Sequence, residues 1–373
     1  MSDRSNQAPP SRHKGVLLAE RYRITRHVGD GRMGEVYVGR DLDTNGRVAL
    51  KLLHQPLCSV EQQVRRFQRE FELTSDLDHA NVVHVLAFGQ QPDGPLEGRH
   101  YLVMEFLEGR GLDAVLADGP LPTGTAVHIA RQVADALSAV HEHGVVHRDL
   151  KPENIQVLSR DAAPDIKVMD FGLGRLQGGD SEHLTDVGIR LGTVEYMSPE
   201  YIAEHELEAH SDLYSLGCVL FHMLTGAPPY RGRSMKVMQD QVTAPVRRPR
   251  EVQPEVPEWL DDLVFSLLAK DPKDRPESAA VVAKTLQDMA STPLPSPRDR
   301  ARKRRGERLN SISPSEGLAS SSHLGGDRQP VYKEPPPAVP ATPVLVTIGL
   351  FVAAVGGMAI LGFVLGAIAI ALM

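Results

Sequence analysis

Residues 21–290 carry strand patterns first and helix patterns afterwards, and this order limits the folds that the chain can adopt. β-Branched and aromatic residues between turn signals predict strands in YRITRHVG, GEVYVGRD, RVALKLL and YLVMEFLEG. Apolar residues at three- and four-residue spacing then predict a helix in AVHIARQVADALSAVHEHG, and SDLYSLGCVLFHMLTG is apolar nearly all round, as a buried helix is. Separate runs of strands and helices indicate an α+β fold with two lobes.

The composition changes outside this segment. Residues 1–20 lack the apolar segment of a signal peptide, and we expect them to be disordered. Pro, Ser and Gly recur through residues 291–343, which have too few large apolar side chains to fold and are expected to form a linker. Residues 344–373 hold no charged side chain, and 30 residues are enough for a transmembrane helix. We therefore expect one C-terminal span that anchors the chain in the cell membrane.

Two features of these flanks have alternative interpretations. Residues 298–308, RDRARKRRGER, hold seven basic side chains against two acidic ones, and form either a solvated charge run or a contact for anionic lipid headgroups. Gly362 and Gly366 have the GxxxG spacing that permits helix dimerisation, although this spacing is common by chance in a span rich in glycine and alanine. A homodimer, through the span or the folded segment, therefore stays open beside a monomeric anchor.

The charge and the cysteine content exclude several classes of protein. A net charge of −7 gives no support for nucleic-acid binding. Two cysteines, Cys58 and Cys218, make no disulfide framework and have no metal-ligand spacing. We expect free thiols and no nucleic-acid partner.

A glycine-rich string, GDGRMG at residues 29–34, separates the first two predicted strands. Without a Cβ atom, such a backbone can approach phosphate oxygens closely. Alone, the string is also typical of a glycine-rich hairpin, and the strand-like EVYVGRD after it does not fit a dinucleotide-binding fingerprint. Lys51 ends the strand VALK, where a lysine is either a solvated edge residue or, beside a phosphate-binding loop, a fixed cation.

A fixed lysine needs an anionic partner. In VRRFQREFELTSDL an inward face at three- and four-residue spacing runs from Val64 to Thr74, and Glu70 lies on it. Because an inward carboxylate is costly unless it is paired, Glu70 is the candidate partner of Lys51. Without the other motifs it would be a surface acid.

Three further strings follow in order: HRDLKPEN at residues 147–154, DFG at residues 170–172, and GT at residues 192–193 followed by SPE at residues 198–200. With these strings, about 270 residues of the chain resemble a eukaryotic-like (Hanks-type) Ser/Thr protein kinase. YLVMEFLEG and GTVEYMSPE are similar to bacterial members. The resemblance implies a two-lobed protein kinase fold with a small β-rich N-lobe and a larger helical C-lobe, ATP and Mg²⁺ as cofactors, and protein Ser/Thr hydroxyls as substrates. The need for ATP implies that this domain faces the cytoplasm.

The resemblance implies a role for each matching residue. Asp149 would accept or orient the proton of the substrate hydroxyl, Lys151 would steady the γ-phosphate, and Lys51 would hold the α- and β-phosphates. Asn154 and Asp170 would hold Mg²⁺, which suits Asp and Asn oxygens beside phosphate. The nucleotide-binding residues would be Val28, Gly29, Asp30, Gly31 and Gly34 in the glycine-rich loop, Val36 and Ala49 above the adenine, Met104 at the back of its pocket, and Glu105 and Leu107 as backbone partners of its edge.

The resemblance also implies structural residues. Asp212 would be the buried acid that braces the catalytic loop, and Arg275 would pair with Glu200. A buried pair of this kind is costly to break from one side. One departure affects the nucleotide site, because Gln156 stands where the family usually has an apolar side chain beneath adenine.

Regulation is implied by Arg148, which in the family waits for a phosphate on the activation segment. Thr185 best matches the primary phosphorylation site, and Val187 stands where bacterial relatives often have a second threonine. Gly192 and Thr193, before SPE, favour Ser/Thr over Tyr as the substrate. Two rival functions remain: a pseudokinase that acts as a binding scaffold, and a small-molecule phosphotransferase with a kinase-like fold.

Overall fold

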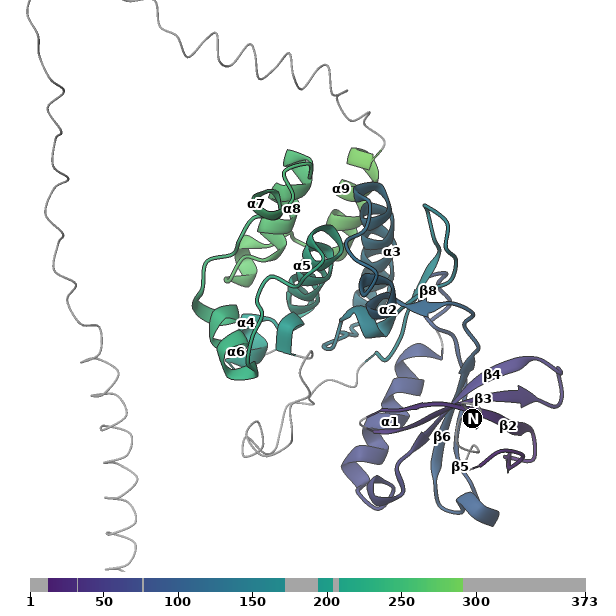
Figure 1. Cartoon of the computed structure of the whole chain (residues 1–373). Helices are drawn as coiled ribbons and strands as arrows, with labels where there is room; N and C mark the ends of the chain where they lie inside the picture. Colours follow the sequence, from purple (N-terminus) through teal and green to yellow (C-terminus); the bar gives the residue numbers. More distant parts are fainter. Residues whose placement is uncertain (1–12, 32, 76, 172–193, 204–207, 291–373) are drawn as a thin grey trace, which may run out of the picture. The chain divides into compact units, whose positions relative to one another are not determined.

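The computed structural model describes residues 13–290, except for residues 32, 76, 172–193 and 204–207 (Figure 1). These residues lie in the first of the two units into which the chain divides, Met1–Ala301 and Arg302–Met373. The strands are β1 (Leu17–Leu18), β2 (Tyr22–Asp30), β3 (Gly34–Asp41), β4 (Arg47–Leu53), β5 (Val85–Gln90), β6 (His100–Glu105), β7 (Arg110–Gly111), β8 (Ile155–Val157) and β9 (Ile166–Val168). The α-helices are α1 (Glu61–Thr74), α2 (Leu112–Leu116), α3 (Thr123–Glu142), α4 (Pro199–Ile202), α5 (Ala209–Thr225), α6 (Ser234–Thr243), α7 (Pro249–Val252), α8 (Glu258–Leu267) and α9 (Ala279–Ala290).

The N-lobe is an antiparallel sheet with the strand order β1-β2-β3-β4-β6-β5. All four strands predicted from the sequence are present, and GEVYVGRD and RVALKLL coincide with β3 and β4. Helix α1 packs against β5 and β6, as Figure 1 shows. Its inward face is confirmed, because Phe67 is fully buried and Thr74 is 1% exposed.

The folded part begins before residue 21, the start expected from the sequence. Strand β1 pairs with β2, and Leu18 is fully buried in the apolar cluster of the sheet, with Tyr22 and Ile24. Leu17 and Leu18, which were expected to be disordered with the rest of residues 1–20, therefore belong to the folded part. Two leucines are too short a run to stand out as a strand before their partner strand is known.

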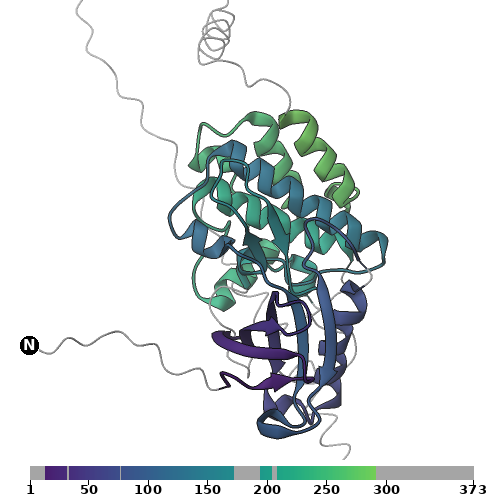
Figure 2. The ribbon, with the colours of Figure 1, turned by 90° about the vertical axis from the view of Figure 1, so that its right-hand side faces the viewer.

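The C-lobe is built around α3 and α5, which pack against each other, with α9 against α3 and α8 against α5. The prediction that α5 is buried all round is confirmed, because its residues from Ser211 to Phe221 are all buried. Figure 2 shows these helices on one side of the short sheet β7-β8-β9, with the N-lobe strands on the other. Strand β8 follows the string HRDLKPEN directly, and β9 leads into DFG, so this small sheet places both strings between the lobes.

In the part of the chain that the structure describes, no helix has the length and apolar character needed to cross a membrane. The expected linker at residues 291–343 and the expected span at residues 344–373 lie outside the described residues.

Candidate active site

The backbone of the string 147–154 is held by Asp212, which lies in the first turn of α5. Its two carboxylate oxygens accept hydrogen bonds of 2.8 Å from the backbone N–H groups of His147 and Arg148. Nε2 of His141 also lies 2.8 Å from Oδ2 of Asp212. The carboxylate is 1% exposed, and the helix N-terminus stabilises its negative charge. The structure thus places Asp212 against the loop that it is expected to brace.

Asp149, Lys151 and Asn154 converge within this string. Nζ of Lys151 donates to Oδ2 of Asp149 at 2.6 Å. Nδ2 of Asn154 donates to the backbone oxygen of Asp149 at 2.8 Å and lies 3.4 Å from Oδ2. Because Asn154 is buried while Asp149 is one-third exposed, the carboxylate is held from the inside and faces outward.

The strings HRDLKPEN and DFG are joined by hydrogen bonds of Met169, the residue before DFG. The N–H of Met169 donates to the carbonyl of Asn154 at 2.9 Å, and Nε2 of His147 donates to the carbonyl of Met169 at 3.0 Å. Asp170 and Arg148 both have left-handed backbones, with φ of 61° and 69°. Non-glycine residues adopt this conformation at a cost and only where the surroundings hold them. Here the bonds around Met169 and Asp212 hold them.

Lys51 joins the N-lobe to Asp170. Its Nζ lies 2.7 Å from Oδ1 of Asp170, across 119 residues of sequence. The lysine side chain is only 9% exposed, and its ammonium lies 6.0 Å from the ring centre of Phe67. Glu70 lies in α1, but its side chain falls outside the described part of the structure, so its pairing with Lys51 stays a prediction.

Asn154 and Asp170 are suitable ligands for Mg²⁺. Both side chains offer oxygen ligands: Asn154 immediately precedes β8, Asp170 follows the end of its antiparallel neighbour β9, and Asp170 is about one-third exposed. Mg²⁺ is usually bound by one or two protein oxygens together with substrate phosphates, so this small donor set fits the ion. Among the described residues, no group of three His, Cys, Asp or Glu side chains suits a metal held by protein alone.

Three of the residues predicted around adenine, Ala49, Met104 and Leu107, meet in one apolar cluster. Ala49 and Met104 are partners in the β4–β6 register, and Leu107 packs into the same cluster. Met33 and Met169 also belong to it. These two methionines were not predicted from the sequence, because an isolated apolar residue in a loop or beside DFG carries no periodic signal. Flexible thioethers pack favourably against aromatic rings such as that of adenine.

The glycine-rich loop joins β2 to β3. Its predicted nucleotide-binding residues flank this turn: Val28, Gly29, Asp30, Gly31, Gly34 and Val36. The N–H of Gly31 donates to the carbonyl of Gly34 at 2.7 Å and closes the turn. A Cβ atom at Gly34 would overlap the carbonyl oxygen of Leu52, so only glycine fits there. Val28 is 54% exposed, which leaves an apolar side chain available beside the loop.

The side chain of Glu105 has a structural role that the sequence did not indicate. Its Oε1 accepts from the N–H of His84 at 2.8 Å and from Nζ of Lys167 at 2.6 Å. Lys167 lies on β9, three residues before Asp170. The segment expected to bind the adenine edge is thereby tied to the strand that carries the metal-binding carboxylate.

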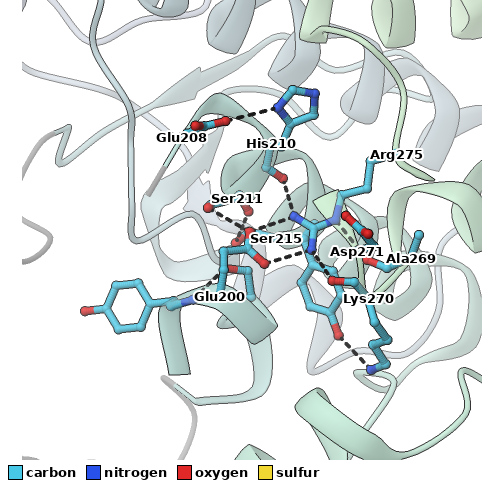
Figure 3. Close-up of polar contacts among 12 residues, drawn as sticks. Glu200, Glu208, His210, Ser211, Ser215, Ala269, Lys270, Asp271 and Arg275 are labelled. Carbon is cyan, nitrogen blue, oxygen red and sulfur yellow. Dashed lines mark hydrogen bonds and ion pairs between the residues drawn. The ribbon is translucent and has the colours of Figure 1, made fainter. Parts of the chain in front are cut away.

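Glu200 and Arg275 form the buried ion pair that the resemblance implies (Figure 3). The guanidinium donates to both carboxylate oxygens at 2.7 and 2.8 Å, and to the carbonyls of Ala269, His210 and Lys270. Burial raises the pKa of Glu200, but the hydrogen bond and charge of Arg275 outweigh burial and leave the pKa lowered. The carboxylate is therefore ionised, and the pair holds the end of the activation segment against the C-lobe.

Thr185 and Thr193 lie outside the described residues, and the description resumes at Val194. The resumed segment is anchored by Tyr196, whose hydroxyl lies 2.8 Å from Nδ1 of His222 on α5. Burial lowers the pKa of His222 to about 4, and the nearby charge of Arg231 adds to this effect.

We expect stability to fall as the pH drops from about 6.5 to about 4, because the unfolded chain then binds a proton that folded His222 does not. After allowance for solvent screening, the loss is about 1–2 kcal/mol in the free energy of unfolding. Urea denaturation at pH 7.5, 6.0 and 5.0 measures it. His222→Gln, which does not titrate, should have a flatter profile, and parallel profiles for the two chains would contradict this assignment.

Comparisons with known proteins agree with this geometry. The model of the protein kinase domain family matches residues 22–286. Serine/threonine-protein kinase pkn3 of Myxococcus xanthus is 39% identical over 282 residues, which are 73% of this chain and 50% of that protein. Serine/threonine-protein kinase PknB of Mycolicibacterium smegmatis is 39% identical over 272 residues, which are 70% of this chain and 42% of that protein. The chain thus spans half or less of the length of these curated relatives.

Solved structures show the same likeness. The crystal structure of the PknI kinase domain of Mycobacterium tuberculosis matches with a TM-score of 0.59 and 27% identity, covering 75% of this chain and 99% of that domain. The two-lobed fold with a β-sheet N-lobe and a helical C-lobe is therefore confirmed. With a family model that covers most of its length, the chain belongs to the protein kinase domain family, and its domain is of the bacterial Hanks type.

Proposed function

We propose that the chain is a Ser/Thr protein kinase that transfers the γ-phosphate of ATP to Ser and Thr hydroxyls of proteins. The observation that carries the proposal is the meeting of Lys51 with Asp170 at 2.7 Å and of Lys151 with Asp149 at 2.6 Å. Two cations beside two carboxylates suit phosphoryl transfer, which depends on positioning and on neutralising charge more than on covalent chemistry.

Each of these residues has a distinct part in the reaction. Lys51, fixed by burial and by Asp170, binds the α- and β-phosphates. Asp149 accepts a hydrogen bond from the substrate hydroxyl and takes up its proton as the oxygen attacks, while Lys151 offsets charge on the transferred phosphate. Mg²⁺ bound by Asn154 and Asp170 would neutralise the phosphate oxygens. The bond from Lys51 and the contacts around Met169 hold Asp170 in its left-handed conformation, with its carboxylate at the site.

The proposal is tested with the full chain, labelled ATP, Mg²⁺ and a protein substrate such as casein. We expect phosphoserine or phosphothreonine in wild type and none in Asp170→Asn, which loses a metal-binding charge. Nucleotide binding without transfer in wild type would favour a scaffold function. Transfer to sugars or antibiotics but not to protein would favour a small-molecule phosphotransferase.

The proposal includes activation by autophosphorylation at Thr185. A phosphate there would add about −1.5 to −2 charges and pair with basic side chains, of which Arg148 is positioned by Asp212. We expect Thr185→Ala to lower turnover of casein while the affinity for ATP is unchanged. Mass spectrometry of phosphorylation sites and initial rates measure this. Equal turnover in the two chains would reject the switch.

The proposal also includes a membrane tether, with residues 344–373 as a single span and the kinase domain in the cytoplasm. It rests on the 30 uncharged residues of this segment. We expect the full chain to sediment with membranes and to resist extraction by carbonate, and a chain ending at residue 340 to remain in the supernatant. Crosslinking of the full chain, compared with Gly362→Leu/Gly366→Leu, tests dimerisation through the span.

A further inference from the structure

A buried ion pair lies at the base of the glycine-rich loop, and the reaction described above does not use it. Nη1 of Arg99 donates to Oε2 of Glu35 at 2.6 Å, and both side chains are about nine-tenths buried. Burial raises the pKa of Glu35, but Arg99 lowers it by more, so the pair is ionised. Glu35 directly follows the last glycine of the loop. Buried ion pairs contribute little net stability, and this pair fixes the geometry at the start of β3.

Arg99 also binds the strand opposite Glu35. Its Nε donates to the carbonyl of Leu53 at 2.9 Å, and its Nη2 lies 3.3 Å from the carbonyl of Leu52. In the β3–β4 register, Glu35 faces Leu52 and Gly34 faces Leu53. One guanidinium therefore holds both strands where they meet the loop. The carbonyl of Leu52 that it contacts is also the one against which Gly34 packs.

His54, the next residue after Leu53, extends this arrangement into the loop. Its backbone N–H donates to the carbonyl of Met33 at 2.9 Å. Its Nε2 lies 3.0 Å from the carbonyl of Gly31, and because a carbonyl only accepts, Nε2 is the donor. One residue thus binds the loop at two points, on either side of residue 32.

We propose that Arg99 and His54 are positioning residues that hold the glycine-rich loop in the conformation that receives the nucleotide phosphates. The inference rests on the proposed function, which assigns this loop to ATP. His54 bonds two loop carbonyls, and Arg99 fixes the base of the loop through Glu35 and the β4 carbonyls. These bonds leave less conformational entropy to be lost when phosphate binds, so affinity for the phosphates rises without direct contact. The adenine cluster lies outside this network, apart from Met33 and Leu53. Arg99 and His54 bond these two residues through their backbone carbonyls, and adenosine lacks the phosphates that the loop is expected to bind. We therefore expect the two residues to affect the binding of ATP and not that of adenosine.

The test compares the affinities of the full chain for ATP and for adenosine, both by calorimetry. Removing one hydrogen bond in His54→Ala should weaken ATP binding about 3- to 10-fold and leave adenosine binding unchanged. His54→Gln, which keeps a donor, should recover part of the loss. His143→Ala is the matched control, because its imidazole also bonds a backbone carbonyl, that of Ala139, on an exposed helix end away from the loop.

Arg99→Met alone would leave the charge of Glu35 buried and endanger folding, so the double variant Glu35→Leu/Arg99→Met is used. It should fold and also bind ATP, but not adenosine, more weakly than wild type. Unchanged ATP affinity in both His54→Ala and the double variant, or an equal loss for adenosine, would overturn the inference. Wild type that binds ATP without transferring phosphate would contradict only the proposed function, since the affinities still decide the role of these residues.

Discussion

Asp149→Asn is expected to lower phosphate transfer to protein about 10²- to 10⁴-fold, the usual contribution of a positioned acid–base group. Asn accepts a hydrogen bond but cannot take up the proton of the substrate hydroxyl. The surroundings should remain, because Asn154 binds the backbone oxygen of residue 149, which the substitution retains. The affinity for ATP should therefore change little, and the loss should appear in kcat. Steady-state kinetics with casein and calorimetry with ATP measure the two quantities.

The matched control for this prediction is Asp161→Asn, in the exposed turn between β8 and β9. It makes the same chemical change twelve residues downstream, and its transfer rate should equal that of wild type. If Asp149→Asn retained full turnover, the role of this carboxylate would be refuted. If it lost turnover and ATP affinity together, the residue would be structural.

Arg275→Met is expected to lower the free energy of unfolding by about 3–5 kcal/mol, since it leaves the carboxylate of Glu200 buried without its partner. The guanidinium is fully buried, the carboxylate is 8% exposed, and Arg275 also satisfies three backbone carbonyls. Urea denaturation followed by fluorescence measures the change. Turnover should fall as well, because the pair anchors the end of the activation segment.

Two comparisons isolate the buried charge as the cause. Arg65→Met breaks an exposed ion pair with Glu61 on α1, and should change stability by less than about 1 kcal/mol. The double variant Glu200→Leu/Arg275→Met removes both charges and should be more stable than Arg275→Met. A cost for Arg275→Met as small as that of Arg65→Met would show that Glu200 is not held as the geometry indicates.

The candidate site was predicted from local strings to a large extent. In HRDLKPEN, DFG and the glycine-rich loop, the functional residues lie within a few positions of each other in sequence. A short turn or the end of a strand is enough to bring such neighbours to the same site. β-Branched and aromatic residues between turn signals likewise predicted β3 and β4, and a helix that is apolar nearly all round predicted the buried α5. These features depend on neighbours in sequence, so sequence alone decides them.

The contacts between distant residues were decided only by the tertiary structure. Arg99 is one charged residue among many in a loop, and its partner Glu35 is 64 positions away. The same is true of Lys167 with Glu105, and of Met33 and Met169 in the adenine cluster. When a charged or apolar residue stands alone, its position in the sequence does not indicate whether its side chain will be buried.

The sequence by itself therefore determined which chemical groups the candidate site contains. They are lysines and carboxylates at short spacing within HRDLKPEN, VALK and DFG. The tertiary structure alone decided what holds those groups in place. Pairing of β3 with β4 buries Glu35 beside Arg99, and the packing of α5 under the catalytic loop turns Asp212 into an acceptor for its backbone. The physical reason is that burial, which makes these ion pairs and hydrogen bonds obligatory, is a property of the packed chain and not of any single segment.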